Sequence, residues 1–236
     1  MKNIFFSIIV PAYNEEDYIA NTIEHLKNLN YPIDSYEVII IENGSKDKTR
    51  EVIKKTIPSR FIYDSIETAS VSKAKNKGFS MVSPFSEWLI ILDADTLIKE
   101  EFLNELNAYI NKIDESKYTA GTPSVSPNSK SLKAKYWFEF YNFAHWLTRT
   151  TYSIQIVRSD MIKEIIFDES LTFGEDTKFI ESVKKKGKFF FYRTDQVLTS
   201  TRRFDAFGYV NLLFIWMFLA SIPYKFKKLI KYKAIR

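Results

Sequence analysis

The sequence predicts an α/β fold in which a mostly parallel central sheet carries helices on both faces. Short apolar runs rich in β-branched residues alternate with segments whose apolar side chains recur at helical spacing. Polar motifs come directly after three of these runs, at 13–15, 42–45 and 93–95. Ligands of open α/β sheets bind beyond the carboxyl ends of the strands, so we expect the three motifs to share one site. The 236 residues suffice for one such domain with a small appendage.

The first half of the chain alternates regularly. We expect strands at 6–10, 38–41, 60–63 and 88–92, and helices at 17–29, 47–55, 70–81 and 99–112. In the second half, strands are expected near 118–122, 154–157, 189–192 and 197–200, with a helix at 175–186. Residues 132–152 are rich in aromatic side chains. These suit a helix packed on the core, and equally a surface that stacks on sugar rings or covers lipid chains.

The composition excludes several chemistries. The sequence has no cysteine, which rules out disulfides, thiolate metal sites and a cysteine nucleophile. The apolar run near the N-terminus is followed by Pro11 without a small-residue cleavage site, so we expect a buried strand and not a signal peptide. The net charge is +5, and much of the excess lies at the C-terminus, in Lys225, Lys227, Lys228, Lys231, Lys233 and Arg236.

The tripeptide Asp93-Ala94-Asp95 is the main candidate for a metal and ligand site. At the end of a strand, two carboxylates one residue apart can turn to different partners, one to a metal ion and one to a ribose or sugar hydroxyl. Mg²⁺ and Mn²⁺ take carboxylate and phosphate oxygens and can act as Lewis acids on a departing diphosphate. Alternatively, both carboxylates are solvated turn residues, or Asp95 caps the helix expected at 99–112.

Five motifs follow one another in a fixed order. They are Pro-Ala-Tyr-Asn-Glu-Glu at 11–16, Glu-Asn-Gly-Ser-Lys-Asp-Lys-Thr at 42–49, Ala-Lys-Asn-Lys-Gly at 74–78, Asp-Ala-Asp at 93–95, and Phe-Asp-Glu at 167–169 with Gly-Glu-Asp at 174–176. Over residues 6–203 the chain resembles the family 2 inverting glycosyltransferases of the GT-A fold. The resemblance implies a Rossmann-like GT-A domain. It also implies transfer of a sugar from a nucleotide diphosphate sugar to a glycan or lipid-linked acceptor, with inversion.

The resemblance further implies roles for individual residues. Asp176 would be the catalytic base with Glu175 beside it, and Asp95 would bind Mn²⁺ or Mg²⁺. The donor would be bound by Pro11, Ala12, Tyr13, Glu15, Asn43, Lys75, Asp93, Ala94, Asp95, Arg202 and Arg203, with the two arginines facing the diphosphate. Trp137, Tyr141 and Trp146 would form the acceptor side.

Two departures from the family pattern bear on the nucleotide. Many members carry an aspartate at the position of Asn43 and an arginine at that of Lys75. A carboxylate can only accept a hydrogen bond from the uracil imide, whereas an amide can accept or donate. We expect UDP as the nucleotide, with GDP or a thymidine diphosphate as alternatives. The two histidines, His25 and His145, are expected to be structural or surface residues.

We also expect the chain to be divided into segments. Residues 1–204 would form the catalytic domain, with 1–98 binding the nucleotide and 99–204 the acceptor, and residues 205–236 would associate with a membrane. The stretch 206–224 is uncharged and, at about 19 residues, could cross a bilayer. A spanning helix would separate the lysines from the cytosolic donor, against the positive-inside tendency. We therefore expect an interfacial or re-entrant element on the cytoplasmic face, broken at Pro223, with its lysines on anionic headgroups; an oligomer contact is the alternative.

Three other functions compete with glycosyl transfer. A sugar-nucleotide nucleotidyltransferase would carry a glycine-rich, arginine-containing loop after the first strand, where this chain has Tyr13-Asn14-Glu15-Glu16. A catalytically inactive, membrane-bound scaffold of the same fold is disfavoured by the intact acidic residues Asp93, Asp95, Glu175 and Asp176. A nucleic-acid binder would rest on the basic tail alone, without a recognition motif, so we expect no nucleic-acid partner.

Overall fold

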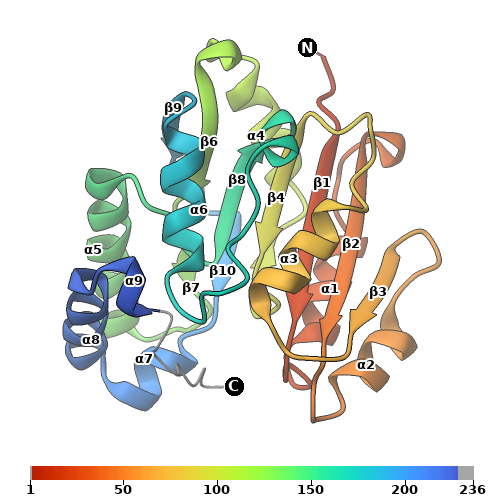
Figure 1. The fold of residues 1–236 in the computed structure, drawn as a ribbon. Coiled ribbons are helices and arrows are strands. Elements are labelled where there is room, and N and C mark those ends of the chain that lie inside the picture. The colour runs from red at the N-terminus through yellow and green to blue at the C-terminus, as the bar shows by residue number, and fades with distance from the viewer. Residues whose placement is uncertain (1, 228–236) are drawn as a thin grey trace.

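A computed structural model describes residues 2–227 of the chain (Figure 1). Its central sheet has seven strands in the order β3 (Ile62–Ile66), β2 (Tyr36–Asn43), β1 (Phe6–Ala12), β4 (Trp88–Leu92), β8 (Ile154–Arg158), β6 (Tyr118–Pro123) and β9 (Lys188–Tyr192). Every pairing is parallel except those of β8, which runs antiparallel to both β4 and β6. The α/β class is therefore confirmed, with a sheet that is mixed because of one strand.

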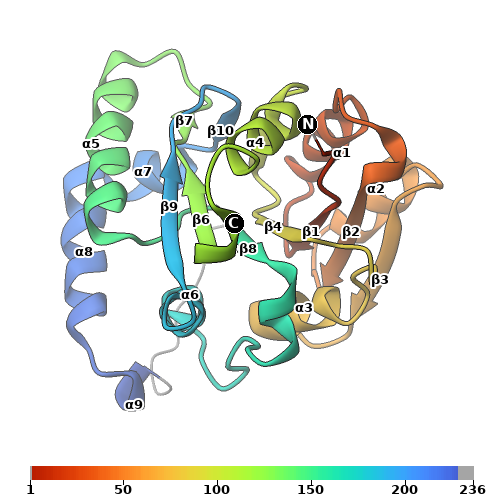
Figure 2. The ribbon, with the colours of Figure 1, turned by 90° about the horizontal axis from the view of Figure 1, so that it is seen from above.

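Helices cover both faces of the sheet, as the sequence predicts (Figure 2). The helices α1 (Ile19–Lys27), α2 (Thr49–Thr56) and α4 (Phe102–Ile110) lie on one side, and α3 (Val71–Phe79) and α6 (Glu175–Lys184) on the other. Successive side chains of a strand point to opposite faces. Accordingly, Ile8 and Val10 of β1 join one buried apolar cluster together with Ile23 of α1, whereas Ile9 joins the other cluster.

A second, smaller sheet was not predicted from the sequence. It consists of β5 (Thr96–Ile98), β10 (Val197–Thr199) and β7 (Ser126–Pro127), with β10 in the middle. Because β5 follows Asp95 directly and α4 begins only at Phe102, Asp95 does not cap that helix, and this alternative is wrong. Short 3-10 turns at Ile33–Ser35, Glu115–Lys117 and Ser159–Lys163 complete the connections.

Four further helices form a layer beside the sheet (Figure 1): α5 (Leu132–Thr148), α7 (Arg202–Phe207), α8 (Tyr209–Ser221) and α9 (Tyr224–Lys227). Aromatic rings join them, since Tyr141 of α5 stacks on Trp216 of α8 with 5.8 Å between centroids. In the described part of the chain, no helix is both long enough and apolar enough to cross a membrane. Four of the basic residues expected at headgroups, Lys228, Lys231, Lys233 and Arg236, lie outside the described residues.

The expected segments of the chain are structurally continuous. Strand β8 pairs with β4 along its whole length, for example Leu89 opposite Val157, so residues 1–98 and 99–204 share one sheet. Helix α7 runs from Arg202 to Phe207 across the expected boundary at 204. Any division of labour between the segments therefore takes place within one folded body.

Candidate active site

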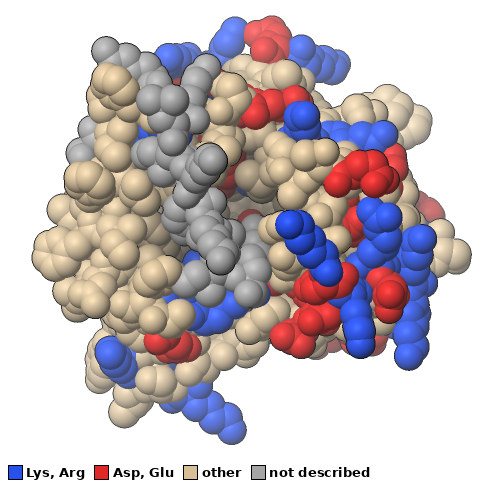
Figure 3. All heavy atoms as spheres, turned by 60° about the horizontal axis from the view of Figure 1, so that its bottom comes forward, with Lys and Arg blue, Asp and Glu red and all other residues tan. Residues whose placement is uncertain are grey.

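The carboxyl ends of β1, β2 and β4 open into a cavity of about 1040 Å³. Figure 3 views the molecule from this end, with charged side chains on one side and a largely uncharged surface on the other. Most of the predicted site residues line the cavity: Pro11, Tyr13, Glu15, Asn43, Lys75, Asp93, Ala94, Asp95, Tyr141, Glu175, Asp176, Arg202 and Arg203. Residues that lie far apart in the sequence, from Pro11 to Arg203, therefore line one cavity.

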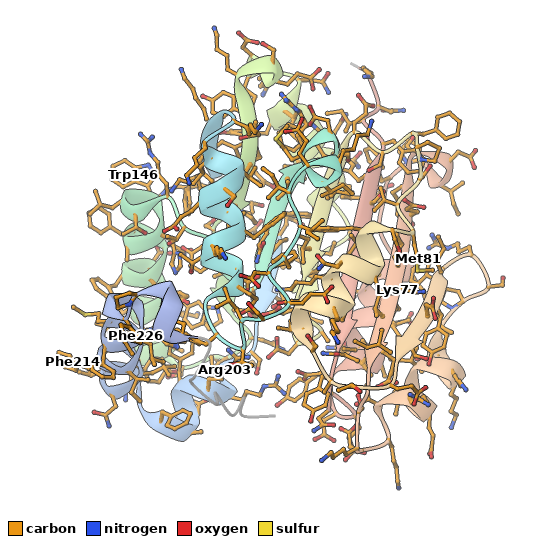
Figure 4. All side chains as sticks on the ribbon, in the orientation of Figure 1. Lys77, Met81, Trp146, Arg203, Phe214 and Phe226 are labelled. Atoms are coloured by element: carbon orange, nitrogen blue, oxygen red, sulfur yellow. The ribbon has the colours of Figure 1, made fainter. Side chains whose placement is uncertain are left out.

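Three predicted residues lie outside the cavity lining. The Ala12 side chain is fully buried in the apolar core. Trp137 packs edge-on against the ring of Tyr209, with the centroids 5.6 Å apart, and so joins α5 to α8. Trp146 is 54% exposed at the outer side of α5 (Figure 4). Of the three aromatic residues expected on the acceptor side, the structure brings only Tyr141 to the cavity.

The loop after β1 is held to the loop after β2. Asn14 adopts a left-handed backbone conformation with φ of 51°, which asparagine tolerates better than most residues. Its Oδ1 accepts a hydrogen bond from the Lys46 amide at 2.8 Å, and the Glu15 amide donates to Thr49 Oγ1 at 2.6 Å. These contacts turn the Glu15 side chain inwards, where it is 1% exposed.

Asn43, at the end of β2, also supports the neighbouring helix. Its Oδ1 accepts a hydrogen bond from the Ser70 amide at 2.7 Å, and Ser70 in turn caps α3 through its side chain. Because the amide oxygen is used within the protein, the NH₂ group of Asn43 is the part that can donate to a ligand.

The Asp93-Ala94-Asp95 turn is fixed from two sides. The Thr96 amide donates to the Asp93 carbonyl at 3.0 Å, and Thr22 Oγ1 of α1 donates to the Ala94 carbonyl at 2.6 Å. The carboxylates have different surroundings. Desolvation raises the pKa of Asp93 to about 6, and the attraction of the Lys75 ammonium offsets this only in part. Asp95 instead faces a guanidinium.

That guanidinium belongs to Arg202, at the start of α7. It donates to Glu15 Oε1 at 2.6 Å and lies 2.9 Å from Asp95 Oδ2. Its carbon lies 4.5 Å from the centre of the Tyr18 ring, within cation–π range. Although desolvation opposes its charge, the two carboxylates raise the pKa of Arg202. Arg202 thus joins the β1 loop, the β4 turn and α7.

Asp176, in the first turn of α6, also lines the cavity. Its Oδ1 accepts hydrogen bonds from Lys75 Nζ and from Gln155 Nε2, each at 2.5 Å. Desolvation alone would raise the pKa of Asp176, but the Lys75 charge and these hydrogen bonds hold it below its ordinary value. Glu175 shows the opposite shift, since desolvation and the adjacent Asp176 raise its pKa to about 7.

The donor set fits a hard divalent ion that takes few ligands from the protein. Among residues 2–227, no three Asp, Glu or His side chains are arranged to hold a metal by themselves. An ion at Asp95 would need the oxygens of a bound diphosphate for most of its shell, and Mg²⁺ is commonly bound in this way. It would also compete with Arg202 for Asp95.

Sequence reasoning missed Gln155, Tyr18 and Thr22. The sequence signal for Gln155 is a polar residue between two isoleucines, Ile154 and Ile156, of an expected strand, and the structure shows it to be 2% exposed. Buried polar side chains are generally hydrogen-bonded, so such a residue calls for a partner. Tyr18 and Thr22 look like ordinary helix residues in the sequence, and their partners on α7 and the β4 turn are remote in the chain.

Comparisons with known proteins identify the family. Residues 7–171 match the family model for glycosyl transferase family 2. A dolichyl N-acetyl-alpha-D-glucosaminyl phosphate 3-beta-D-2,3-diacetamido-2,3-dideoxy-beta-D-glucuronosyltransferase from Methanococcus voltae is 26% identical over 219 residues, 83% of this chain and 66% of that protein. Across the curated relatives with the most extensive matches, this chain spans 22 to 66% of their length.

Solved structures share the fold. The crystal structure of S. aureus TarS 1–349 in complex with UDP-GlcNAc has a TM-score of 0.67 at 20% identity, covering 95% of this chain and 69% of that one. The mannosyltransferase PcManGT from Pyrobaculum calidifontis, in complex with GDP-Man and Mn²⁺, has a TM-score of 0.64 at 17% identity, covering 96% and 68%. With the family model matching more than half of its residues, the chain belongs to glycosyl transferase family 2.

Proposed function

We propose that this protein transfers a sugar from a nucleotide diphosphate sugar, by preference a UDP-sugar, to an acceptor hydroxyl with inversion at the anomeric carbon. One observation carries the proposal. The strand-end carboxylates Asp93 and Asp95, the cation Arg202 and the Asp176 carboxylate of α6 line the same cavity. Arg202, and a metal ion held by the strand-end carboxylates, would bind the diphosphate of the donor. The Asp176 carboxylate would accept the proton of the acceptor hydroxyl. The S. aureus TarS complex with UDP-GlcNAc supports UDP as the nucleotide.

Asp176 is the base in this proposal. As the acceptor oxygen bonds to the anomeric carbon, its proton passes to the Asp176 carboxylate. The bond from that carbon to the diphosphate breaks on the opposite face, and its electron pair leaves with the nucleoside diphosphate. A carboxylate that stays ionised below neutral pH is ready to accept the proton, and Lys75 keeps Asp176 in that form.

The departing diphosphate carries the negative charge. Arg202 and Arg203 line the cavity and can donate to its oxygens. A bound Mn²⁺ or Mg²⁺, held through Asp95, would stabilise the same charge as a Lewis acid. The Mn²⁺ named with PcManGT supports this assignment. Arg202 would then exchange its contact with Asp95 for one with the diphosphate.

The decisive experiment combines donor turnover with one variant. UDP-, GDP- and dTDP-sugars are incubated with Mn²⁺ or Mg²⁺ and candidate acceptors, and nucleotide release and product configuration are measured. Asp176→Asn should lower kcat by a factor of about 10²–10⁴, with UDP binding retained. Asp160→Asn, an exposed carboxylate paired with Arg158, is the matched control and should leave turnover unchanged. Near-normal turnover by Asp176→Asn would refute the base assignment.

The same assay separates the competing functions. A nucleotidyltransferase would release pyrophosphate from a nucleoside triphosphate and a sugar phosphate, whereas a glycosyltransferase releases a nucleoside diphosphate. An inactive scaffold would bind the nucleotide without releasing it from the sugar. The turn at Asn14 and the inward Glu15 offer no glycine-rich phosphate loop, which favours the glycosyltransferase.

We further propose that the acceptor is a glycan or is linked to a lipid, and that the protein works at the cytoplasmic face of a membrane. Support comes from the apolar side of the cavity, where Phe140 and Tyr141 of α5 face Leu213, Trp216 and Met217 of α8. The relative from Methanococcus voltae is named for a dolichyl phosphate sugar. We define the α5–α8 face as the exposed apolar side chains of these helices and α9: Leu132, Tyr136, Phe140, Phe143, Trp146, Leu147, Val210, Phe214, Ile215, Met217, Phe218 and Phe226.

A further inference from the structure

A buried ammonium and a buried amide bind the same oxygen of Asp176. Lys75 Nζ and Gln155 Nε2 both donate to Oδ1 at 2.5 Å. Lys75 is 1% exposed and Gln155 is 2% exposed, so neither group reaches bulk water. The Asp176 side chain itself is 38% exposed and lines the cavity. One carboxylate oxygen is therefore anchored inside the protein, while the residue as a whole remains accessible.

The position of Lys75 differs from the one expected for a donor ligand. Its ammonium contacts Asp176, and it lies 4.9 Å from the centre of the Phe167 ring. A buried lysine with this surrounding is a charge partner for a carboxylate, since an unpaired buried charge would be costly. The family resemblance assigned Lys75 to the nucleotide, whereas the geometry assigns its charge to the acidic end of the cavity.

The elements that carry the two donors are rigidly placed. Helix α3 approaches β1 so closely that a Cβ at Gly78 would lie 2.5 Å from Ile9 Cγ2. The Asn76 side chain on α3 accepts from the Phe167 amide at 2.9 Å and donates to the Phe167 carbonyl at 3.0 Å, which ties α3 to the loop before α6. Gln155 lies within β8, between two strands of the sheet.

We propose that Lys75 and Gln155 are positioning residues for the base: together they anchor Oδ1 of Asp176, so that Oδ2 takes the proton of the acceptor hydroxyl, and Lys75 keeps the carboxylate ionised. The inference rests on the proposed function. With Oδ1 already accepting two hydrogen bonds, Oδ2 is the oxygen with capacity for a new one. Holding a base in one orientation lowers the barrier to reaction by reducing the entropy lost at that step.

Other charged groups also face Asp176. Glu175, adjacent on the same helix, and Asp93, at the end of β4, both interact with it electrostatically. Arg203 of α7 acts on Asp93 in turn. Lys75 is thus the cation that directly offsets three clustered carboxyl groups, and its removal should disturb their protonation more than the loss of the neutral Gln155.

The test uses four variants of the full chain. Lys75→Met removes the charge, Lys75→Arg keeps it, and Gln155→Leu removes the amide. Lys77→Met removes a cation from the same helix on the side facing β3, where Lys77 pairs with Asp64 at 2.8 Å (Figure 4). The Asp176 carboxyl is titrated by ¹³C NMR, UDP affinity is measured by calorimetry, and kcat is followed against pH.

For Lys75→Met we expect the Asp176 titration and the acid limb of the kcat profile to move to higher pH by about one to three pH units. The kcat at neutral pH should fall at least tenfold, with less than a threefold change in UDP affinity. Lys75→Arg should keep the acid limb of the kcat profile at its wild-type pH. Gln155→Leu should lower kcat with a smaller movement of the limb, and Lys77→Met should resemble wild type.

A tenfold loss of UDP affinity by Lys75→Met, with an unmoved acid limb, would instead make Lys75 a donor ligand and overturn the proposal. If Lys75→Met does not fold, Gln155→Leu decides, with Lys75→Arg as the control that keeps the charge. An unchanged kcat and an unchanged Asp176 titration in Gln155→Leu would then also overturn the proposal. The NMR titration needs no turnover. If the Asp176 titration moves in Lys75→Met but the wild-type protein transfers no sugar, the anchoring of Asp176 is upheld and the proposed function is refuted.

Discussion

Arg202 contacts two carboxylates that lie far from it in the chain. Glu15 is 1% exposed, and the Asp95 side chain is 12% exposed, so neither is well solvated. Arg202→Met would remove the guanidinium from both carboxylates. Removing one partner from a buried ion pair typically destabilises a protein by about 3–5 kcal/mol, and we expect a loss of that order. Urea unfolding at neutral pH measures it.

The matched control for this prediction is Arg193→Met, since Arg193 is exposed. It should change the free energy of unfolding by less than about 0.5 kcal/mol. Arg202→Met with wild-type stability would show that other groups compensate the two carboxylates. The proposed contact of Arg202 with the diphosphate would then be separable from its role in folding.

The residues of the site could be predicted where they follow strand ends. Asp93 and Asp95 follow β4 directly, and Asn43 ends β2. The strands could be recognised from local sequence, which was enough to predict that these three residues share a site. Gln155 and the pairing of Lys75 with Asp176 could not be predicted. They depend on β8 entering the sheet antiparallel beside β4 and on α3 and α6 lying on the same face, and both are consequences of packing over long separations.

At the scale of elements, apolar periodicity predicted the long strands and helices and missed the smallest strands. Strand β5 has three residues and β7 has two, too few to show alternation. They exist because β10 lies between them, with Thr199 opposite Thr96 and Leu198 opposite Ser126. Of the aromatic residues expected on the acceptor side, Trp137, Tyr141 and Trp146, only Tyr141 lines the cavity, together with Phe140 of the same helix.

The close contact between α3 and β1 predicts how a substitution at Gly78 affects stability. A methyl group at Gly78 would clash with Ile9 Cγ2, so Gly78→Ala should destabilise the protein by about 1–3 kcal/mol despite its better helix propensity. Ile9→Ala removes the opposing methyl and leaves a cavity of its own. In a double-mutant cycle, the two changes together should cost less than the sum of the single costs. Strict additivity would contradict a direct contact.

Helix α5 also carries a pH-sensitive contact. His145 packs 3.8 Å from the centre of the Tyr152 ring, and its Nδ1 lies 2.7 Å from Thr150 Oγ1. Desolvation lowers the pKa of His145 to about 4. Because the unfolded chain then binds the proton more tightly, this contribution to stability is present above about pH 6.5 and is lost as the pH falls towards 4. The effect is at most about 3 kcal/mol.

His145→Phe removes the titrating group while keeping a ring. Its free energy of unfolding should fall less steeply than that of wild type between pH 6.5 and 4.5, measured by urea unfolding at each pH. Trp146→Phe, which changes an exposed ring on the same helix, is the control and should keep the wild-type slope. Parallel curves for His145→Phe and wild type would show that His145 is not the residue responsible.

At the scale of the whole molecule, charge and apolar surface are segregated. Figure 3 shows charged side chains crowded over α1 and α2, whereas the surface over α5 and α8 is largely uncharged. Helix α8 has no charged residue between Tyr209 and Ser221, and the charged residues of α5 are Lys133 and Lys135 in its first turn and Glu139. Exposed apolar patches of this kind mark interaction sites in soluble proteins. The sequence predicted the apolar stretch, but its shape as a short helix packed on α5 required the structure.

The proposed membrane contact can be tested on this α5–α8 face. Phe214 and Phe218 are 64% and 68% exposed one helical turn apart, and Phe85, 77% exposed, lies near the opposite end of the molecule between α3 and β4. Flotation with vesicles containing anionic lipid should recover wild type and Phe85→Ser equally. Phe214→Ser/Phe218→Ser should lose most of the bound fraction, because two buried aromatic side chains contribute about 3–6 kcal/mol. If the double variant floats like wild type, or if wild type stays in solution and forms dimers that the double variant does not, the face is not a membrane contact and an oligomer contact is the better assignment.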